Sequence, residues 1–382
     1  MRVLHTSDWH VGRLFHGRDL LAEQEAVLGG LADMCEDEHV DVLVVSGDLY
    51  DRAVPSAEAV QTCARILRRI AAADVRIVIT PGNHDSAPRL GAFGEFAAAG
   101  GLHLRTAIAD LDRPVLLDET HGPVALYGIP YLEPDPARHA LGMAQPQGHA
   151  GVLGEAMRRV RQDLATRPKQ TRSVVLAHAF VIGGEPSDSE RTIAVGGVPS
   201  VPAGTFRGVD YVALGHLHGP QRLADNLRYS GSPLAYSFSE ARHRKSVWLV
   251  ELDHGGLAGV EQRELPVPRA LGTVRGELGD LLTDPVHESL TDRFLSVVLT
   301  DRVRPLDAMR RLRTRFPHAL HMEWLPEGGH VRPRRYAEAT RGRPDEEVAC
   351  CFVADTRGAE PSESERGLLR EALAAVAGTE PE

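Results

Sequence analysis

The sequence is poor in cysteine and has no long apolar segment. Only 4 of its 382 residues are cysteines, and none stands in a Cys-x-x-Cys spacing. We interpret Cys35, Cys63, Cys350 and Cys351 as reduced, mostly buried thiols, which offer no thiolate cluster to a soft metal. No apolar run approaches the roughly 20 residues that span a bilayer, so we expect no membrane partner.

Positive charge is also scarce, since 43 lysines and arginines face 53 aspartates and glutamates. The net charge of −10 argues mildly against nucleic acid as a substrate, although binding depends on local patches and on bound metal. Between residues 302 and 343 the balance reverses, with Arg310, Arg311, Arg313, Arg315, Arg332, Arg334, Arg335, Arg341 and Arg343. Both a solvated face and a contact with DNA are compatible with this arginine-rich run.

The length allows two domains, or one domain with a smaller satellite. Pro266-Val267-Pro268 marks a boundary, and we predict domains at residues 1–265, 266–345 and 346–382. The amino terminus reads as a buried strand that runs into Asp8 and His10. A cleaved signal peptide would remove both residues, so we expect a cytoplasmic protein.

The first part of the chain alternates between strand and helix patterns. Apolar, β-branched runs predict strands at 2–6, 41–46 and 75–80, and longer periodic segments predict helices at 22–37 and 56–72. This βαβαβ order indicates an α/β layer fold. Each strand ends at a polar motif, and sites in such folds lie at the carboxyl ends of the strands.

The remainder of the first domain predicts a second sheet. Its expected elements are strands at 124–128, 173–177, 211–214, 229–232 and 246–252 and a helix at 152–166. We therefore expect an α/β sandwich of two sheets packed face to face, flanked by helices.

The carboxy-terminal part predicts a small α+β capping domain and a tail. Strands at 294–300 and 319–324 flank a helix at 305–316, and 326–344 is loop-rich. The apolar run around Cys350 predicts a strand. A helix is expected at 362–377, where Ser362 and Glu365 have the spacing of a capping box.

Five polar motifs follow the predicted strands. They are Asp8-Trp9-His10, Gly47-Asp48-Leu49-Tyr50-Asp51, Gly82-Asn83-His84-Asp85, Ala177-His178 and Gly215-His216-Leu217-His218. Asp-x-His or Gly-His-x-His alone would be a weak signal, and Gly-Asn-His-Asp and Gly-Asp-x-x-Asp are stronger ones. All five in order at strand ends predict a single dinuclear metal site. The candidate ligands are Asp8, His10, Asp48, Asn83, His178, His216 and His218.

These side chains suit a phosphoesterase. Two ions about 3.5–4 Å apart need a bridging ligand, and Asp48 at the end of a central strand is our candidate. Nitrogen and oxygen ligands suit manganese, iron or zinc. Two divalent ions less two carboxylates leave a charge of about +2, which attracts an anionic phosphate ester.

Three further residues are candidates for the chemistry. His84 follows the ligand Asn83, so its ring can lie near the ions without binding them. It can then protonate the departing oxygen or stabilise the charge of the phosphorane. Asp51 is placed to orient that ring through its carboxylate. Arg52 is a candidate substrate-binding residue, although a surface ion pair would explain it equally well.

With these motifs, the chain resembles the calcineurin-like metallophosphoesterases. Within them it is similar to the SbcD family of bacterial nuclease subunits, a branch of the break-repair nucleases. The likeness rests on His5-Thr-Ser-Asp-Trp-His-Val-Gly12, Ala177-His-Ala-Phe-Val181 and Tyr229-Ser-Gly-Ser-Pro-Leu234. It covers residues up to about 255 and continues less specifically through about 270–325.

The resemblance implies a ligand assignment and a function. One metal would be held by Asp8, His10, Asp48 and His218, and the other by Asp48, Asn83, His178 and His216, with His84 as the catalytic histidine. It further implies manganese as the metal, and activity as a 3′→5′ exonuclease on duplex DNA and an endonuclease on single strands. The partner would be an SbcC-type coiled-coil ATPase, in a heterotetramer built on a nuclease homodimer. Helix 362–377 would be a natural docking element for it, or a simple packed helix.

Three functions therefore remain in view. A DNA nuclease is the leading hypothesis, because a phosphatase needs no additional βαβ unit with an arginine-rich helix. A small-molecule or protein phosphatase on the same site is the alternative. A non-catalytic scaffold for an ATPase is disfavoured, since a decayed site should show gaps in its ligand set.

Overall fold

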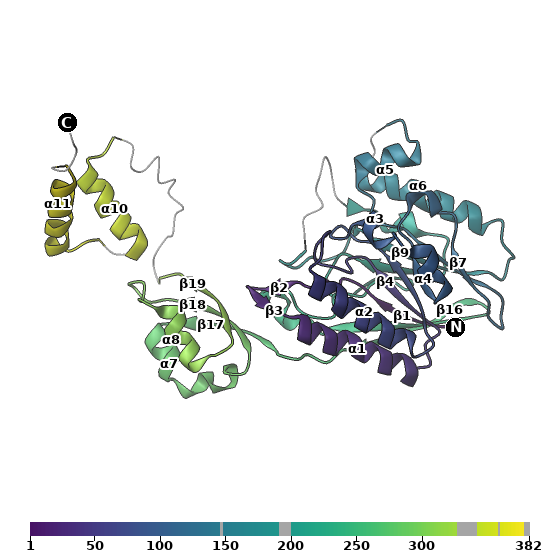
Figure 1. Ribbon diagram of the computed structural model, residues 1–382, viewed down its shortest axis with the longest axis horizontal. Helices are drawn as coiled ribbons and strands as arrows, with labels where there is room; N and C mark the ends of the chain where they lie inside the picture. The colour runs from purple at the N-terminus through teal and green to yellow at the C-terminus, as the bar shows by residue number, and fades with distance from the viewer. Residues whose placement is uncertain (146–147, 191–199, 327–341, 358–359, 378–382) are drawn as a thin grey trace. The chain divides into compact units, whose positions relative to one another are not determined.

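The computed structural model describes residues 1–145, 148–190, 200–326, 342–357 and 360–377 (Figure 1). The chain divides into two compact units, Met1–Pro268 and Arg269–Glu382. The finer division at residues 265 and 345 stays a prediction. Within the described ranges, no helix is both long enough and apolar enough to cross a bilayer.

The first sheet of the first unit has six strands in the order β16-β15-β1-β4-β5-β6. Their bounds are β1 Arg2–Thr6, β4 Val42–Ser46, β5 Arg76–Thr80, β6 Leu102–Leu104, β15 Ser246–Asp253 and β16 Gly256–Glu264. Strands β1, β4, β5 and β6 are parallel to one another, and β15 pairs with β1 in antiparallel register. The parallel strands therefore end at one edge of the sheet.

The second sheet has the order β13-β14-β12-β9-β8-β7. Its strands are β7 Val115–Leu117, β8 Val124–Gly128, β9 Arg172–His178, β12 Tyr211–Gly215, β13 Gln221–Ala224 and β14 Leu227–Tyr229. The central strands β8, β9, β12 and β14 are parallel. The closing strand predicted at 229–232 ends at Tyr229, because the chain then turns at Gly231, whose φ is +79°.

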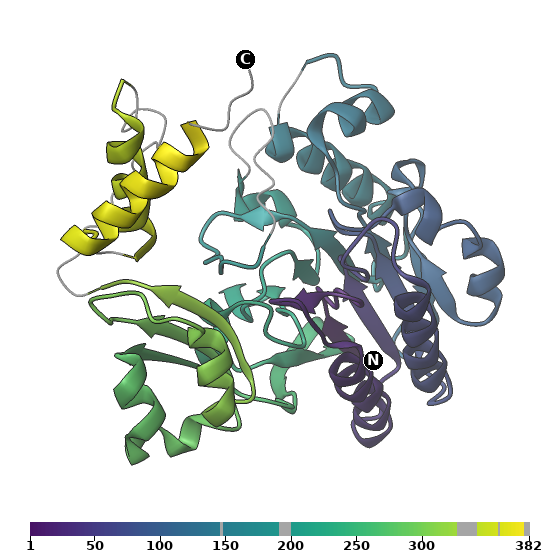
Figure 2. The same ribbon diagram turned by 60° about the vertical axis from the view of Figure 1, so that its left-hand side comes forward.

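The two sheets pack face to face through alternate side chains of their central strands. Val42 and Val44 of β4 lie in one apolar cluster with Val174 and Leu176 of β9. Figures 1 and 2 show α1 (Leu21–Asp37) and α2 (Ala57–Ala71) beside the first sheet, and α6 (Gly148–Leu164) packs on the second through residues such as Met157. The predicted sandwich flanked by helices is confirmed.

Short elements complete the first unit. They are β2 Leu14–Phe15, β3 Arg18–Asp19, α3 Ala87–Leu90, α4 Gly94–Ala99, η1 Ile108–Asp110, α5 Pro134–Leu141, β10 Phe180–Val181, β11 Ser200–Val201, η2 Ala203–Phe206 and η3 Phe238–Arg242.

The second unit begins with a small parallel sheet of order β17-β18-β19. Its elements are β17 Leu271–Gly276, α7 Leu278–Thr283, η4 Pro285–Leu290, β18 Phe294–Leu299, α8 Ala308–Arg315 and β19 Ala319–Trp324. Leu295 and Leu299 of the central strand pack with Leu312 and Phe316 in a separate apolar core. The β18-α8-β19 succession is the βαβ unit expected from the sequence.

The prediction of a strand around Cys350 is wrong, because Cys350 lies in helix α10, Asp345–Arg357. Three acidic residues in the first turn of this helix complement its dipole, and a six-residue apolar run alone does not distinguish helix from strand.

The next helix, α11, spans Glu363–Ala377. Its capping box is confirmed: Ser362 N donates to Glu365 Oε2 at 2.7 Å, and Glu365 N donates to Ser362 Oγ at 3.4 Å. Most of the predicted loop at 326–344, including Arg332, Arg334, Arg335 and Arg341, lies outside the described residues.

Candidate metal centre

The five polar motifs meet at one edge of the sandwich. Strands β1, β4 and β5 of the first sheet and β9 and β12 of the second each end at one of them. A bridge between Val11 and Tyr50 joins two of the loops, and Asp8 N donates to Gly47 O at 3.1 Å. Residues far apart in the chain are thus gathered by parallel strands that end together.

Four of the candidate ligands have left-handed backbone conformations. The φ angles are 52° at Asp8, 46° at His10, 51° at Asp48 and 104° at His216. A non-glycine residue in this region costs about 1–3 kcal/mol and is typical of functional sites. The sharp turns direct side chains from the strand ends into a shared interior.

Three glycines make room for these side chains. A Cβ on Gly47 would lie 2.1 Å from His178 Nδ1, and a Cβ on Gly82 would lie 2.1 Å from Asp48 Oδ1. A Cβ on Gly215 would lie 1.8 Å from the carbonyl oxygen of Ser46. Only glycine lets the ligand loops approach this closely.

Asp8, His10 and His218 form one buried group that could hold a cation. The Nε2 atoms of His10 and His218 face each other at 3.1 Å. Asp8 is fixed from behind, because its carboxylate accepts from His216 N at 3.0 and 3.1 Å and from the Ser7 hydroxyl. Two imidazole nitrogens and a carboxylate oxygen therefore converge on one point.

Asp48 stands at the centre of the arrangement. Its Oδ2 lies 3.4 Å from His178 Nε2 and 3.6 Å from His10 Nε2, which is the placement expected of a bridging ligand. His178 Nε2 also donates to Asn83 Oδ1 at 2.9 Å, while His178 Nδ1 donates to Ser46 O at 3.1 Å. The ring of His216 lies beside that of His178, with centroids 5.3 Å apart.

The charges of the buried groups fit a cation site. Burial by itself lowers the pKa of His178, but Asp48 outweighs it and raises that pKa to about 9. The resulting imidazolium balances buried carboxylates, and a divalent cation would displace its proton. Burial lowers the pKa of His10 well below its usual value and, with His178, lowers that of His216 to about 3, so both rings are neutral as metal ligands must be.

His84 is held at the centre by its backbone and one ring nitrogen. Its backbone N–H donates to Asp48 Oδ1 at 2.9 Å, and its Nδ1 donates to the carbonyl oxygen of Asp51 at 2.8 Å. The Asp51 carboxylate, which we expected to orient the ring, lies 3.9 Å from Nδ1. The main chain of Asp51 thus makes the hydrogen bond, and the catalytic roles of both residues stay predictions.

Two guanidinium groups lie near Asp51. Arg52 Nε is 3.6 Å from Asp51 Oδ2, and 73% of the Arg52 side chain is exposed. Arg13, which the sequence did not single out, lies 3.7 Å from Asp51 Oδ1 and only 16% of it is exposed. The geometry is that of an ion pair for Arg52, and its contact with substrate stays a prediction.

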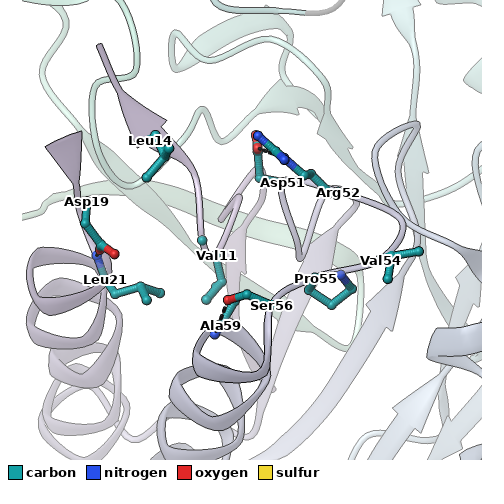
Figure 3. Close-up of a pocket in the computed structure, with 11 residues that line it drawn as sticks. Val11, Leu14, Asp19, Leu21, Asp51, Arg52, Val54, Pro55, Ser56 and Ala59 are labelled. Atoms are coloured by element: carbon teal, nitrogen blue, oxygen red, sulfur yellow. Dashed lines mark hydrogen bonds and ion pairs between the residues drawn. The ribbon is translucent and has the colours of Figure 1, made fainter. Parts of the chain in front are cut away.

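Asp51 and Arg52 also line a cavity of about 330 Å³ (Figure 3). Leu14, Leu21 and Val54 supply apolar walls, and Arg52 lies at its rim. None of the residues that line it is a candidate metal ligand. Of the predicted site residues, it contains only Asp51 and Arg52.

Asp85 is a positioning residue that sequence reasoning left unused. Its Oδ2 accepts from Leu49 N at 3.0 Å and Gly82 N at 2.9 Å, and its Oδ1 accepts from Tyr50 N at 2.9 Å. One carboxylate therefore joins the loop after β4 to the loop after β5. Its place in the Gly-Asn-His-Asp motif was a signal, but its partners could not be read from spacing.

Imidazole nitrogens and carboxylate oxygens clustered around Asp48 are typical of a class of protein, the metal-dependent hydrolases of phosphate esters. A family model described as calcineurin-like phosphoesterase matches residues 1–220, more than half of the chain. The chain belongs to this family.

Two solved structures are similar to this chain. The protein TT1561 of Thermus thermophilus is 15% identical with a TM-score of 0.38, over 69% of this chain and 98% of that one. A dimetal phosphatase from Danio rerio is 14% identical with a TM-score of 0.40, over 70% of this chain and 99% of that one.

Proposed function

We propose that this protein is the metal-dependent nuclease subunit of an SbcCD-type complex. It would degrade duplex DNA as a 3′→5′ exonuclease and cut single strands as an endonuclease, with manganese as the metal. Its partner would be an SbcC-type coiled-coil ATPase, joined to a nuclease homodimer for DNA end processing and repair. The observation that carries the catalytic part is His84, a buried imidazole fixed between Asp48 and Asp51 beside the ligand cluster.

The residues divide the work of phosphodiester hydrolysis. Two ions held by the seven ligands would neutralise phosphate charge and lower the pKa of attacking water. His84 would protonate the leaving oxygen. Its Nδ1 proton is committed to the Asp51 carbonyl, so Nε2 is the nitrogen that exchanges a proton with substrate. The hydrogen bond from His84 N to Asp48 Oδ1 fixes the position of His84 relative to the bridging carboxylate.

The segments that carry the family resemblance support the metal loops. The Tyr229 hydroxyl donates to Ala179 O at 2.7 Å and accepts from Val181 N at 2.8 Å, so it ties the segment after His178 to the segment at 229–234. Ser232 N in turn donates to His218 O at 3.1 Å. The presence of these two segments, at 177–181 and 229–234, favours the nuclease branch over a generic phosphatase.

The second unit supports DNA as the substrate. The side chains of Arg310 and Arg311 on α8 are exposed, as are those of Arg302 and Arg304 before it. Arg310 pairs with Asp307, which leaves Arg302, Arg304 and Arg311 as exposed cations. Because counterion release dominates DNA affinity, such side chains could bind phosphates despite the net charge of −10. We propose that the ATPase partner provides the rest of the DNA-binding surface. Tight duplex binding by the isolated subunit at physiological salt would contradict that part of the proposal.

The experiment is manganese-dependent cleavage of an end-labelled duplex by the purified protein and its His84→Ala variant. We expect the variant to cleave roughly 10²–10⁴-fold more slowly with its metal content unchanged. His121→Ala, which changes an exposed histidine outside the motifs, is the matched control. Hydrolysis of an aryl phosphodiester with DNA left intact, even with an SbcC-type ATPase added, would instead support the phosphatase alternative.

A further inference from the structure

A buried chain of polar side chains lies behind the candidate ligand His218. Ser189 Oγ is within hydrogen-bond distance of both His218 Nδ1 and Glu240 Oε1. Glu240 pairs with Lys245, whose Nζ also donates to Ser232 Oγ at 2.9 Å and to His218 O at 3.0 Å. Between 1% and 8% of each of His218, Ser189, Glu240 and Lys245 is exposed.

The charged groups at the end of this chain favour one order of its protons. Glu240 forms a buried ion pair with Lys245, which identifies it as a carboxylate at this end of the chain. Ser187 Oγ also lies 3.0 Å from Ser189 Oγ, but it donates its own proton to Glu190 Oε2 and is the more distant acceptor. A carboxylate only accepts, so the single hydroxyl proton of Ser189 goes to Glu240, which is charged and nearer. The oxygen of Ser189 must then accept from His218, which places the ring proton of His218 on Nδ1.

This tautomer matters because of what the other nitrogen faces. With the proton on Nδ1, the lone pair of His218 Nε2 is directed at His10 Nε2, 3.1 Å away in the ligand cluster. The opposite tautomer would point an N–H into the cluster and could not bind a cation. Hydrogen-bonded partners of this kind fix the ring orientation and raise the basicity of a metal-bound histidine.

We propose that Ser189 and Glu240 are positioning residues that select the metal-binding tautomer of His218 and so set the affinity of one of the two metal positions. The inference rests on the proposed metal centre and adds two residues to it that no motif contains. Glu190 reinforces the arrangement, since its Oε1 accepts from His218 N at 2.7 Å. The segment at 187–190 is therefore part of the support of one metal position.

The first test is Mn²⁺ binding to the full-length protein, with free Mn²⁺ followed by electron paramagnetic resonance. We expect wild type to bind two ions per chain and Ser189→Ala to bind one of them roughly 10–100-fold more weakly. Ser189→Thr, which keeps the hydroxyl, should restore binding. Ser239→Ala is the matched control, because Ser239 Oγ accepts from Asp188 N at 3.0 Å in the same segment without contacting His218.

The second test reads the tautomer itself. In metal-free protein labelled with ¹⁵N-histidine, the His218 signal, assigned by its loss in His218→Gln, should show a protonated Nδ1 in wild type and a tautomer mixture in Ser189→Ala. An unchanged binding isotherm and tautomer in Ser189→Ala would overturn the proposal, as would equal loss of both ions. If both tests succeed but DNA is not cleaved, the proposed nuclease function fails and the positioning role stands.

Discussion

At the scale of single residues, Gly82 is the glycine that constrains the central carboxylate, Asp48. A methyl group there would lie 2.1 Å from Asp48 Oδ1 and 2.4 Å from Asp48 N. We expect Gly82→Ala to displace Asp48, to weaken binding of both ions and to lower the free energy of unfolding by about 1–3 kcal/mol. Metal titration and urea unfolding would measure the two effects.

Gly154→Ala is the matched control for this change. Gly154 lies within α6 and a Cβ there would meet nothing within 4 Å, so we expect stability to be unchanged or to rise by up to about 1 kcal/mol. Equal metal affinity in both alanine variants would show that Asp48 is not held by the approach of Gly82.

His5 provides a prediction about pH. Its ring is buried between Tyr211 OH, 3.0 Å from Nδ1, and Leu214 O, 3.2 Å from Nε2, and burial lowers its pKa to about 3. Between about pH 3 and 6.5 the unfolded chain binds the extra proton, so stability falls as the pH drops through 6.5. At pH 5 this protonation of the unfolded chain lowers the free energy of unfolding by about 2 kcal/mol relative to its value well above pH 6.5.

The measurement is the free energy of unfolding between pH 5 and 7 for wild type and His5→Gln. We expect the variant to be less stable at pH 7 but to lose less stability on acidification. His254→Gln, at an exposed ring, is the control. If His5→Gln and wild type have the same slope, His5 is not a source of the acid sensitivity.

The candidate ligands could be proposed from the sequence, and their supports could not. Asp8, Asp48 and His178 stand directly at strand ends, where short motifs with fixed spacing indicate a shared site. Ser189 and Glu240 meet across 51 residues and belong to no spacing pattern. Contacts of this kind depend on how loops pack in three dimensions, which periodicity does not describe.

At the scale of elements, Asp85 couples the loops after β4 and β5. Asp85→Ala would remove the acceptor of three buried or half-buried backbone N–H groups, on Leu49, Tyr50 and Gly82. We expect a loss of about 1–3 kcal/mol in unfolding free energy and faster metal release, since Asp48 and Asn83 lie on the two loops. Asp85→Asn, which keeps one acceptor oxygen, should fall between alanine and wild type.

Stopped-flow chelation would measure metal release from the Asp85 variants. Asp253→Ala is a control of similar chemistry, because its Oδ1 accepts from Gly255 N at 2.7 Å in an exposed turn. Release rates that are the same in Asp85→Ala and wild type would contradict the coupling of the two loops.

Helices and strands of the sandwich were predictable because their apolar periods were long or were bounded by turns. The strands Arg2–Thr6 and Val124–Gly128 have the predicted bounds. The Cys350 segment was mistaken for a strand, because its apolar run is short and the three acidic residues that favour a helix stand before it. The residues before the apolar run therefore determine that it forms a helix, which the run alone does not indicate.

At the scale of the whole molecule, every candidate ligand lies in the unit Met1–Pro268. We expect a protein truncated after Pro268 to bind two ions and hydrolyse an aryl phosphodiester at the full-length rate, but to cleave duplex DNA more slowly. Parallel assays of the two substrates would test this. Equal loss of both activities would indicate that the first unit needs the second for its stability. If the truncated protein keeps both activities at the full-length rates, the second unit does not contribute to DNA binding.

The left-handed backbone at Asp8, His10, Asp48 and His216 limits what can replace these residues during evolution. Asparagine, aspartate and histidine tolerate this conformation better than other non-glycine residues. All three also carry an oxygen or nitrogen donor. Exchanges among these three residue types preserve the turns but change the hardness and charge of the donor atom. Single substitutions can therefore change the metal preference of the site without disrupting the fold.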